Sequence, residues 1–185
     1  DGGMAKHGRR GGPGTGLGRG SYEDVHRQSV EKPAEFWAEE AERLHWFRRW
    51  DCVLDDSRPP FFRWFPGGET NLCYNAVDRH VLAGRGERAA IIWESPETGE
   101  SRTIPFGELL PWVQQFAAIL KRQGVSKGDR VLIYLPMVPE ALVAALACVR
   151  IGAVHSIVFA GFSGESLAHR IEDSQSEVVV CADGS

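Results

Sequence analysis

The sequence predicts an α/β protein: a three-layer, open, mostly parallel sheet with helices on both faces, preceded by an α-helical and aromatic N-terminal arm. First, residues 131–159 contain only two formal charges, Glu140 and Arg150. Second, the hydrophobicity of the two strands in this segment is continuous rather than alternating, which is typical of strands buried on both faces of a parallel sheet. Third, strand-like and helix-like segments follow one another in the order β-β-α-β-α-β-α-β after residue 88.

The first 20 residues, DGGMAKHGRRGGPGTGLGRG, form a small basic, glycine-rich tail without apolar periodicity. We expect residues 1–20 to be disordered. The stretch 16–20 (GLGRG) superficially resembles a phosphate-binding loop, but no strand precedes it and the Walker lysine is absent. The tail also lacks a secretory apolar core and the amphipathic pattern of a transit peptide.

Residues 21–84 are predicted to form an N-terminal arm. Two amphipathic helices, separated near Pro33, would each bury a stripe that contains aromatic side chains. A cluster of aromatic residues follows at 61–65 (FFRWF), and a short helix begins at about Asn75. Two short helices cannot build a core alone, so we expect the arm to lie on the surface of a larger body.

Residues 85–185 are predicted to form the first part of a large α/β domain. Strands at 89–94 and 101–104 are joined by a turn rich in Pro and Gly, as in a hairpin. A helix follows over 106–123, in which Pro111 should cause a kink or shift the start.

The apolar segment itself divides into strand, helix and strand. Residues 131–135 are short and branched, Pro139 suits a first helical turn, and Gly152 ends the helix before a strand at 153–159. This βαβ unit should be right-handed. A further helix at 163–173 and a strand at 177–182 complete the order.

Composition excludes several classes of protein. With 185 residues and 43% apolar content, the chain can build one core. The formal charge of -4 argues against a dedicated nucleic-acid binder, and the prolines and glycine within 131–159 argue against a membrane span. The cysteines are too scattered for a disulfide framework or a metal site, and Cys148 and Cys181 are expected to act as small hydrophobic residues; the full set is Cys52, Cys73, Cys148 and Cys181.

Ligands of such sheets bind where strands end and helices begin. Two loops qualify, residues 135–139 and 159–164. The N–H groups at the start of a helix suit an anion, but Ser163 is also a good N-cap and Gly161 a good turn residue without any ligand. The residues alone favour this second interpretation.

Two further candidates carry titratable groups. His155 lies in an apolar strand, and we interpret it as a hydrogen-bonded core histidine because no Ser, Cys or acid stands at recognisable triad spacing. The run Asp78-Arg79-His80 is placed on a helix, where consecutive side chains point apart. It therefore predicts solvent contacts and an ion pair rather than acid–base machinery.

Many motifs in one order resemble a known family. The chain from about Tyr22 to its last residue resembles the N-terminal part of the AMP-forming short-chain acyl-CoA synthetases, the acetyl- and propionyl-CoA synthetase group of adenylate-forming enzymes. The form of residues 71–80 is closer to propionyl-CoA synthetases. The motifs are Phe36-Trp37, FRWF (62–65), NLCYNAVDRH (71–80), GRG (84–86), residues 89–93, KGDRV (127–131), YLPM (134–137), ACVRIGAVHS (147–156) and FAGFS (159–163).

The resemblance implies an acid–thiol ligase. The complete enzyme would use ATP and Mg²⁺ to convert a short-chain carboxylate, propionate rather than acetate, into an acyl-adenylate, from which the thiol of coenzyme A displaces AMP. No catalytic residue and no metal ligand is assigned within this chain, because the family's phosphate loop, pockets and C-terminal lysine are expected after residue 185. The fragment should therefore be inactive alone and bind none of these cofactors tightly.

One ligand contact is implied within the chain. Gly161 matches a glycine that lets the coenzyme A nucleotide approach the backbone, and its lack of a side chain gives this role a physical sense. Ala160 replaces a glycine common in the family. The implied partners are the small-molecule substrates and the remainder of the synthetase chain, without nucleic acid or membrane. The implied location is the cytoplasm, or the mitochondrial matrix in a eukaryote.

Two other functions fit parts of the pattern. A truncated, non-catalytic interaction module could pair an exposed sheet edge with another protein. A dinucleotide-dependent oxidoreductase would share the βαβ units, but no glycine fingerprint follows a strand.

Overall fold

The computed structural model describes residues 20–183, and the tail predicted over residues 1–20 lies outside them except for Gly20. The chain divides into two compact units. The first unit comprises the residues up to Leu44 together with Trp50–Gly67, and the second comprises His45–Arg49 and the residues from Gly68 onward.

The first unit contains the two helices predicted for the arm, α1 (Tyr22–Glu31) and α2 (Pro33–Ala41). Helix α1 begins with a capping box, in which the Ser21 hydroxyl accepts from the N–H of Asp24 and the Asp24 carboxylate accepts from the N–H of Ser21. Pro33 then separates the helices as the first residue of α2, where its missing N–H is not needed. The predicted break is confirmed.

The predicted burial of aromatic stripes holds for only one of these helices. Phe36 and Ala41 of α2 are buried, whereas no residue of α1 is, and Tyr22 is 78% exposed. The predicted burial of a stripe on α1 is wrong. Among the helices and strands of this unit, α2 is the one that packs closely beside α1, and it leaves the α1 side chains exposed.

A short antiparallel pair, β1 (Leu54–Asp55) and β2 (Arg63–Trp64), completes the first unit and was not predicted. Each strand is only two residues long, so it leaves no hydrophobic alternation to detect. Part of the aromatic cluster packs within its own unit: Trp64 contacts Trp37 of α2 edge to face with ring centroids 6.5 Å apart, whereas Phe61 and Phe62 are exposed.

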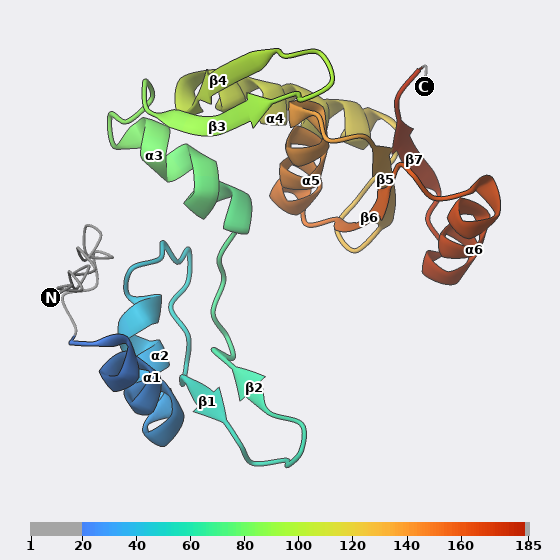
Figure 1. Ribbon diagram of the computed structural model, residues 1–185. Coiled ribbons are helices and arrows are strands. Elements are labelled where there is room, and N and C mark those ends of the chain that lie inside the picture. Colours follow the sequence, from blue (N-terminus) through green and yellow to red (C-terminus); the bar gives the residue numbers. More distant parts are fainter. Residues whose placement is uncertain (1–19, 184–185) are drawn as a thin grey trace, which may run out of the picture. The chain divides into compact units, whose positions relative to one another are not determined.

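The second unit carries the α/β fold (Figure 1). Its element order matches the predicted β-β-α-β-α-β-α-β, preceded by a helical segment close to Asn75. The elements are η1 (Tyr74–Asp78), α3 (Arg79–Leu82), β3 (Ala89–Glu94), β4 (Ser101–Pro105), α4 (Phe106–Arg122), β5 (Arg130–Leu135), α5 (Pro139–Ile151), β6 (Val154–Phe159), α6 (Gly164–Ser174) and β7 (Val178–Cys181).

Two sheets form in this unit. Strands β3 and β4 pair as the predicted antiparallel hairpin, and β5 pairs in parallel with β6 on one side and β7 on the other. The predicted parallel sheet is therefore confirmed. Helix α5 connects β5 to β6 and ends at Gly152, whose left-handed backbone (φ 77°) caps it as predicted.

Burial on both faces is confirmed for β5 and wrong for β6. Val131, Leu132 and Ile133 have no exposed surface, whereas Ile157 and Phe159 are 59% and 63% exposed. The difference follows from position in the sheet, since β5 has a strand on each side and β6 pairs only with β5 within the described chain.

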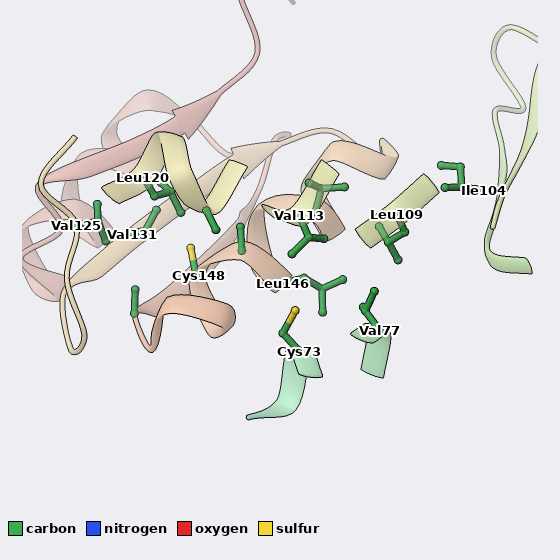
Figure 2. Packing of buried hydrophobic residues seen from close by; sticks show 14 residues of the cluster. Cys73, Val77, Ile104, Leu109, Val113, Leu120, Val125, Val131, Leu146 and Cys148 are labelled. Carbon is green, nitrogen blue, oxygen red and sulfur yellow. The ribbon is translucent and has the colours of Figure 1, made fainter. Parts of the chain in front are cut away.

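The core forms where α4 packs against α5 (Figure 2). Helix α4 contributes a buried stripe of Leu109, Val113, Ala117 and Leu120, spaced as an amphipathic helix requires. Pro111 lies inside this helix, which nonetheless begins at Phe106, so the proline does not shift its start. No helix within residues 20–183 is both long and apolar enough to cross a membrane.

The four cysteines are free thiols in two different environments. Cys73 and Cys148 are buried in the core, and burial raises the pKa of both thiols, that of Cys148 to about 11. Cys52 and Cys181 are exposed. Cys181 lies in β7 as predicted, but it is wrong to treat it as a buried hydrophobic residue, because the last position of this strand faces solvent.

Thiol labelling at pH 8 should separate these environments. We expect Cys52 and Cys181 to react rapidly with a chromogenic disulfide, because they are exposed. Cys148 and Cys73 should react only after unfolding in urea, since they are buried and a thiol with a pKa of about 11 is scarcely ionised at pH 8. Rapid reaction of all four thiols in the native protein would contradict the packing of α5.

Candidate functional site

Two loops meet at the carboxyl edge of the parallel sheet. One joins β5 to α5 after Leu135, and the other joins β6 to α6 after Phe159. Leu135 and Phe159 are register partners, so the two loops leave the sheet side by side. This edge is where ligands of open α/β sheets bind.

The β6–α6 loop contains Gly161 and is built as the sequence predicted. The N–H of Phe162 donates to the carbonyl of Phe159 at 3.1 Å, which closes a turn around Gly161. Ser163 is the N-cap of α6, and its hydroxyl accepts from the N–H of Ser166 at 3.3 Å. The turn and the cap are both confirmed, and neither of them requires a ligand.

Gly161 lies against the ring of Phe159. A Cβ added there would lie 2.6 Å from Cε1 of Phe159, well inside van der Waals contact. The Phe159 ring is 63% exposed, so it could turn away from a larger residue. The glycine therefore keeps the loop backbone in contact with an aromatic side chain at the edge of the sheet.

Sequence reasoning missed the residue that ties this loop to the sheet. The hydroxyl of Tyr134, near the end of β5, lies 2.7 Å from the carbonyl oxygen of Ala160 and 3.0 Å from that of Phe162. A signal was present, because a hydroxyl in a strand that is otherwise apolar must find a hydrogen-bond partner when it is partly buried.

An aromatic side chain also holds the β5–α5 loop. The indole N–H of Trp93, in β3, donates to the carbonyl of Met137 at 2.7 Å. Met137 itself is 82% exposed. Both loops at the carboxyl edge are thus fixed through a backbone carbonyl by a side chain from a strand.

His155 lies on β6 at the edge of the sheet, paired with Val131 of β5. It is half-buried, and its side chain makes no hydrogen bond within the described residues, although its backbone lies in the β5–β6 ladder. The prediction of a hydrogen-bonded core histidine is therefore wrong. The reason is that β6 has a neighbouring strand on one side only within the described chain, which leaves His155 partly exposed. No group of three or more His, Cys, Asp or Glu side chains within residues 20–183 is placed to hold a metal ion.

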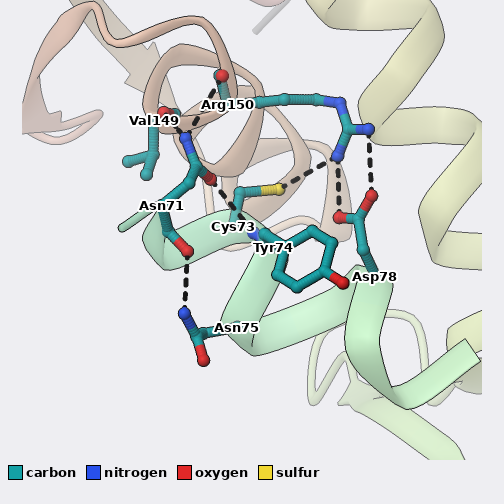
Figure 3. Close-up of polar contacts among 7 residues, drawn as sticks. All are labelled: Asn71, Cys73, Tyr74, Asn75, Asp78, Val149 and Arg150. Atoms are coloured by element: carbon teal, nitrogen blue, oxygen red, sulfur yellow. Dashed lines mark hydrogen bonds and ion pairs between the residues drawn. The ribbon is translucent and has the colours of Figure 1, made fainter. Parts of the chain in front are cut away.

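A second polar cluster surrounds Arg150 (Figure 3). Its guanidinium donates to both oxygens of Asp78, at 2.7 and 3.0 Å, and lies 3.8 Å from the sulfur of Cys73. Asn71 donates to the carbonyls of Val149 and Arg150. These contacts join the segment 71–78 to the C-terminal end of α5.

The ion pair predicted for Asp78-Arg79-His80 exists, but the predicted solvent contact of Asp78 is wrong. Asp78 is only 8% exposed, because it pairs with Arg150 of another helix. In an α-helix, residues five apart point about 140° away from each other. The π-helical turn of η1 is wider, and it brings Cys73 and Asp78 to the same guanidinium.

The other members of this run have structural roles. Arg79 donates to the side chain of Asn75 at 2.9 Å. The His80 ring packs on Phe106 with centroids 4.8 Å apart, and burial followed by the nearby arginines lowers its pKa. The lowered pKa favours the neutral form of His80, whose ring packs against Phe106.

We predict that Asp78→Asn lowers the free energy of unfolding by about 2 kcal/mol, because it leaves the half-buried charge of Arg150 without its carboxylate. Urea unfolding followed by circular dichroism measures the loss. The matched control is Glu108→Gln, which removes the more exposed ion pair with Arg102 and should cost less than about 1 kcal/mol. An equal loss of unfolding free energy in the two variants would show that the buried Arg150–Asp78 pair stabilises the fold no more than the exposed Arg102–Glu108 pair.

Comparisons with known proteins agree with an α/β fold. Residues 22–76 match the family model described as the acetyl-coenzyme A synthetase N-terminus, and residues 78–185 match the model described as AMP-binding enzyme. A small parallel sheet with connecting helices, as in α/β proteins, is the class of structure that the chain shows. The chain belongs to the AMP-binding enzyme family, and the predicted relation to short-chain acyl-CoA synthetases is confirmed.

Similar proteins carry related names. An acetyl-coenzyme A synthetase from Magnetococcus marinus is 52% identical over 165 residues, which cover 88% of this chain and 26% of the relative. Another acetyl-coenzyme A synthetase, from Deinococcus radiodurans, is 52% identical over 170 residues, which cover 92% of this chain and 26% of the relative. Acyl-CoA synthetase short-chain family member 3, mitochondrial, from Rattus norvegicus is 45% identical over 168 residues, which cover 91% of this chain and 24% of the relative. The chain thus spans about a quarter of the length of these relatives.

Proposed function

We propose that this chain is the N-terminal region of an AMP-forming acyl-CoA synthetase. The whole enzyme joins a short-chain carboxylate to ATP as an acyl-adenylate, with Mg²⁺, and then transfers the acyl group to coenzyme A. The observation that supports this most is the 52% identity to acetyl-coenzyme A synthetases across nine-tenths of the chain. Propionate is favoured over acetate because of the form of residues 71–80.

The strand order supports a ligand-binding crevice at the carboxyl edge. Strand β5 is flanked by β6 and β7, so the connections through α5 and α6 run in opposite directions across the sheet. We infer that both connections are right-handed, which would put α5 and α6 on opposite faces and give the proposed three-layer arrangement. The loops after β5 and β6 diverge at this switch point, and ligands bind where such loops separate.

Gly161 lies in one of these two diverging loops, and we assign it a contact with the coenzyme A nucleotide. Within this proposal, residues 21–84 serve as the N-terminal arm of the synthetase and residues 85–185 as the first part of its AMP-binding domain. The catalytic groups would come from the part of the enzyme that this chain does not span, so we propose that the chain alone is inactive.

The inactivity is tested by pyrophosphate exchange. The isolated chain, incubated with ATP, Mg²⁺ and propionate or acetate, should transfer no labelled pyrophosphate into ATP above the background without carboxylate. The Magnetococcus marinus relative, assayed in parallel, provides the positive control. Carboxylate-dependent exchange by the isolated chain would overturn the assignment of catalysis to the remainder of the enzyme.

The role of Gly161 is tested in a chimera, in which this chain replaces the matching quarter of the Magnetococcus marinus relative. We predict that Gly161→Ala raises the KM for coenzyme A about tenfold and leaves pyrophosphate exchange within about twofold, because the added Cβ displaces either the ligand or the Phe159 ring.

The control for this variant is Gly164→Ala, three residues further along, where an added Cβ meets nothing within 4 Å. It should leave both parameters unchanged. A chimera that melts cooperatively but lacks activity before any substitution would contradict the proposed function. A Gly161→Ala chimera with an unchanged KM would contradict only the contact assigned to Gly161.

A further inference from the structure

The β6–α6 loop is attached to the rest of the sheet through one side-chain hydroxyl. Tyr134 Oη lies 2.7 Å from the oxygen of Ala160 and 3.0 Å from that of Phe162. Within residues 20–183, these are the only hydrogen bonds that reach the carbonyls of Ala160, Gly161 and Phe162 from outside the loop. The hydroxyl has one hydrogen, which the two carbonyls share.

The position of Tyr134 makes this attachment rigid. Its neighbours Leu132 and Ile133 are fully buried in the central strand of the sheet, with hydrogen-bonded partners on both sides. A tyrosine ring has only two side-chain torsions, so little freedom remains between this strand and the hydroxyl. The loop is therefore held from the most buried part of the sheet.

The two bonds also set the direction of the peptide groups on either side of Gly161. In a trans peptide, the C=O and the following N–H point in opposite directions. When the carbonyls of Ala160 and Phe162 point toward Tyr134, the N–H groups of Gly161 and Ser163 point away from it. Neither N–H makes a hydrogen bond within the described part of the chain.

Apart from the turn bond between the N–H of Phe162 and the carbonyl of Phe159, the other contacts of the loop involve its side chains. The guanidinium of Arg170 lies over the ring of Phe162, 5.2 Å from its centroid, and the rings of Phe159 and Phe162 meet edge to face at 6.1 Å. These aromatic contacts are exposed, since Phe162 is 44% exposed and Phe159 is 63% exposed. Within residues 20–183, the hydroxyl of Tyr134 is thus the donor outside the loop that fixes the carbonyls of Ala160 and Phe162.

We propose that Tyr134 is a positioning residue for the coenzyme A step: its hydroxyl clamps the carbonyls of Ala160 and Phe162, and so fixes Gly161 where the nucleotide of coenzyme A passes. This inference rests on the proposed function of the loop. It assigns Tyr134 no contact with substrate and no part in forming the adenylate.

The clamp is tested first without any ligand, in the 185-residue chain. Tyr134→Phe removes the hydroxyl and keeps the ring, so the core should stay packed. The amide of Phe162, which donates to Phe159, should exchange its hydrogen about fivefold faster, the factor expected from one ordinary hydrogen bond. The amide of Ala153, in the cap that ends α5, should keep its rate.

The matched control is Tyr74→Phe, because the Tyr74 hydroxyl makes no hydrogen bond within residues 20–183.

The consequence for coenzyme A is tested in the chimera. Tyr134→Phe should raise the KM for coenzyme A about fivefold and leave carboxylate-dependent pyrophosphate exchange within about twofold, whereas Tyr74→Phe changes neither. A general loss of stability would lower both activities together, so the separation of the two identifies a positioning role.

The two experiments fail in different ways. An unchanged amide hydrogen exchange rate at Phe162 in Tyr134→Phe would overturn the clamp, whatever the effect of Gly161→Ala on the KM. Faster exchange with an unchanged KM, when Gly161→Ala does raise the KM, would overturn the positioning role of Tyr134. An unchanged KM in both variants would instead overturn the assignment of this loop to coenzyme A, and with it this inference.

Discussion

The structure of the second unit depends on the burial of the centre of β5. Val131, Leu132 and Ile133 expose no surface, which requires a strand on each side and cover on both faces. The crossover through α5 and the return through α6 to the far side of β5 meet the first requirement. The same arrangement separates the two loops at the carboxyl edge, so the burial of one strand also places the candidate site.

Arg150, one of the two charges in the apolar segment 131–159, is accommodated by a partner far away in the sequence. Arg150 could not stay on the inner part of α5 without a carboxylate, and Asp78 supplies it with two hydrogen bonds. The pairing needs the π turn of η1, which directs Asp78 and Cys73 to one guanidinium. The segment that contains η1 is thereby joined to α5 by charge as well as by apolar contact.

The elements with strong local signals could be predicted from the sequence, whereas features set by distant partners could not. Gly152, Pro139 and Ser163 act through their own backbone or hydrogen bonds, and each stands where its pattern indicated. The exposure of β6, the burial of Asp78 and the open position of His155 depend on which segment lies opposite. The apolar strands read alike in the sequence, but only β5 is central.

The candidate site illustrates how a requirement of folding becomes available to function. A hydroxyl at the end of an apolar strand needs acceptors, and those of the adjoining strands are occupied by the sheet. The free carbonyls nearest to the end of β5 belong to the loop that follows β6, because parallel strands end at the same edge. Satisfying Tyr134 therefore fixes this loop by necessity. A ligand that binds there meets a backbone whose ordering has already been achieved by folding, and less conformational entropy remains to be lost on binding.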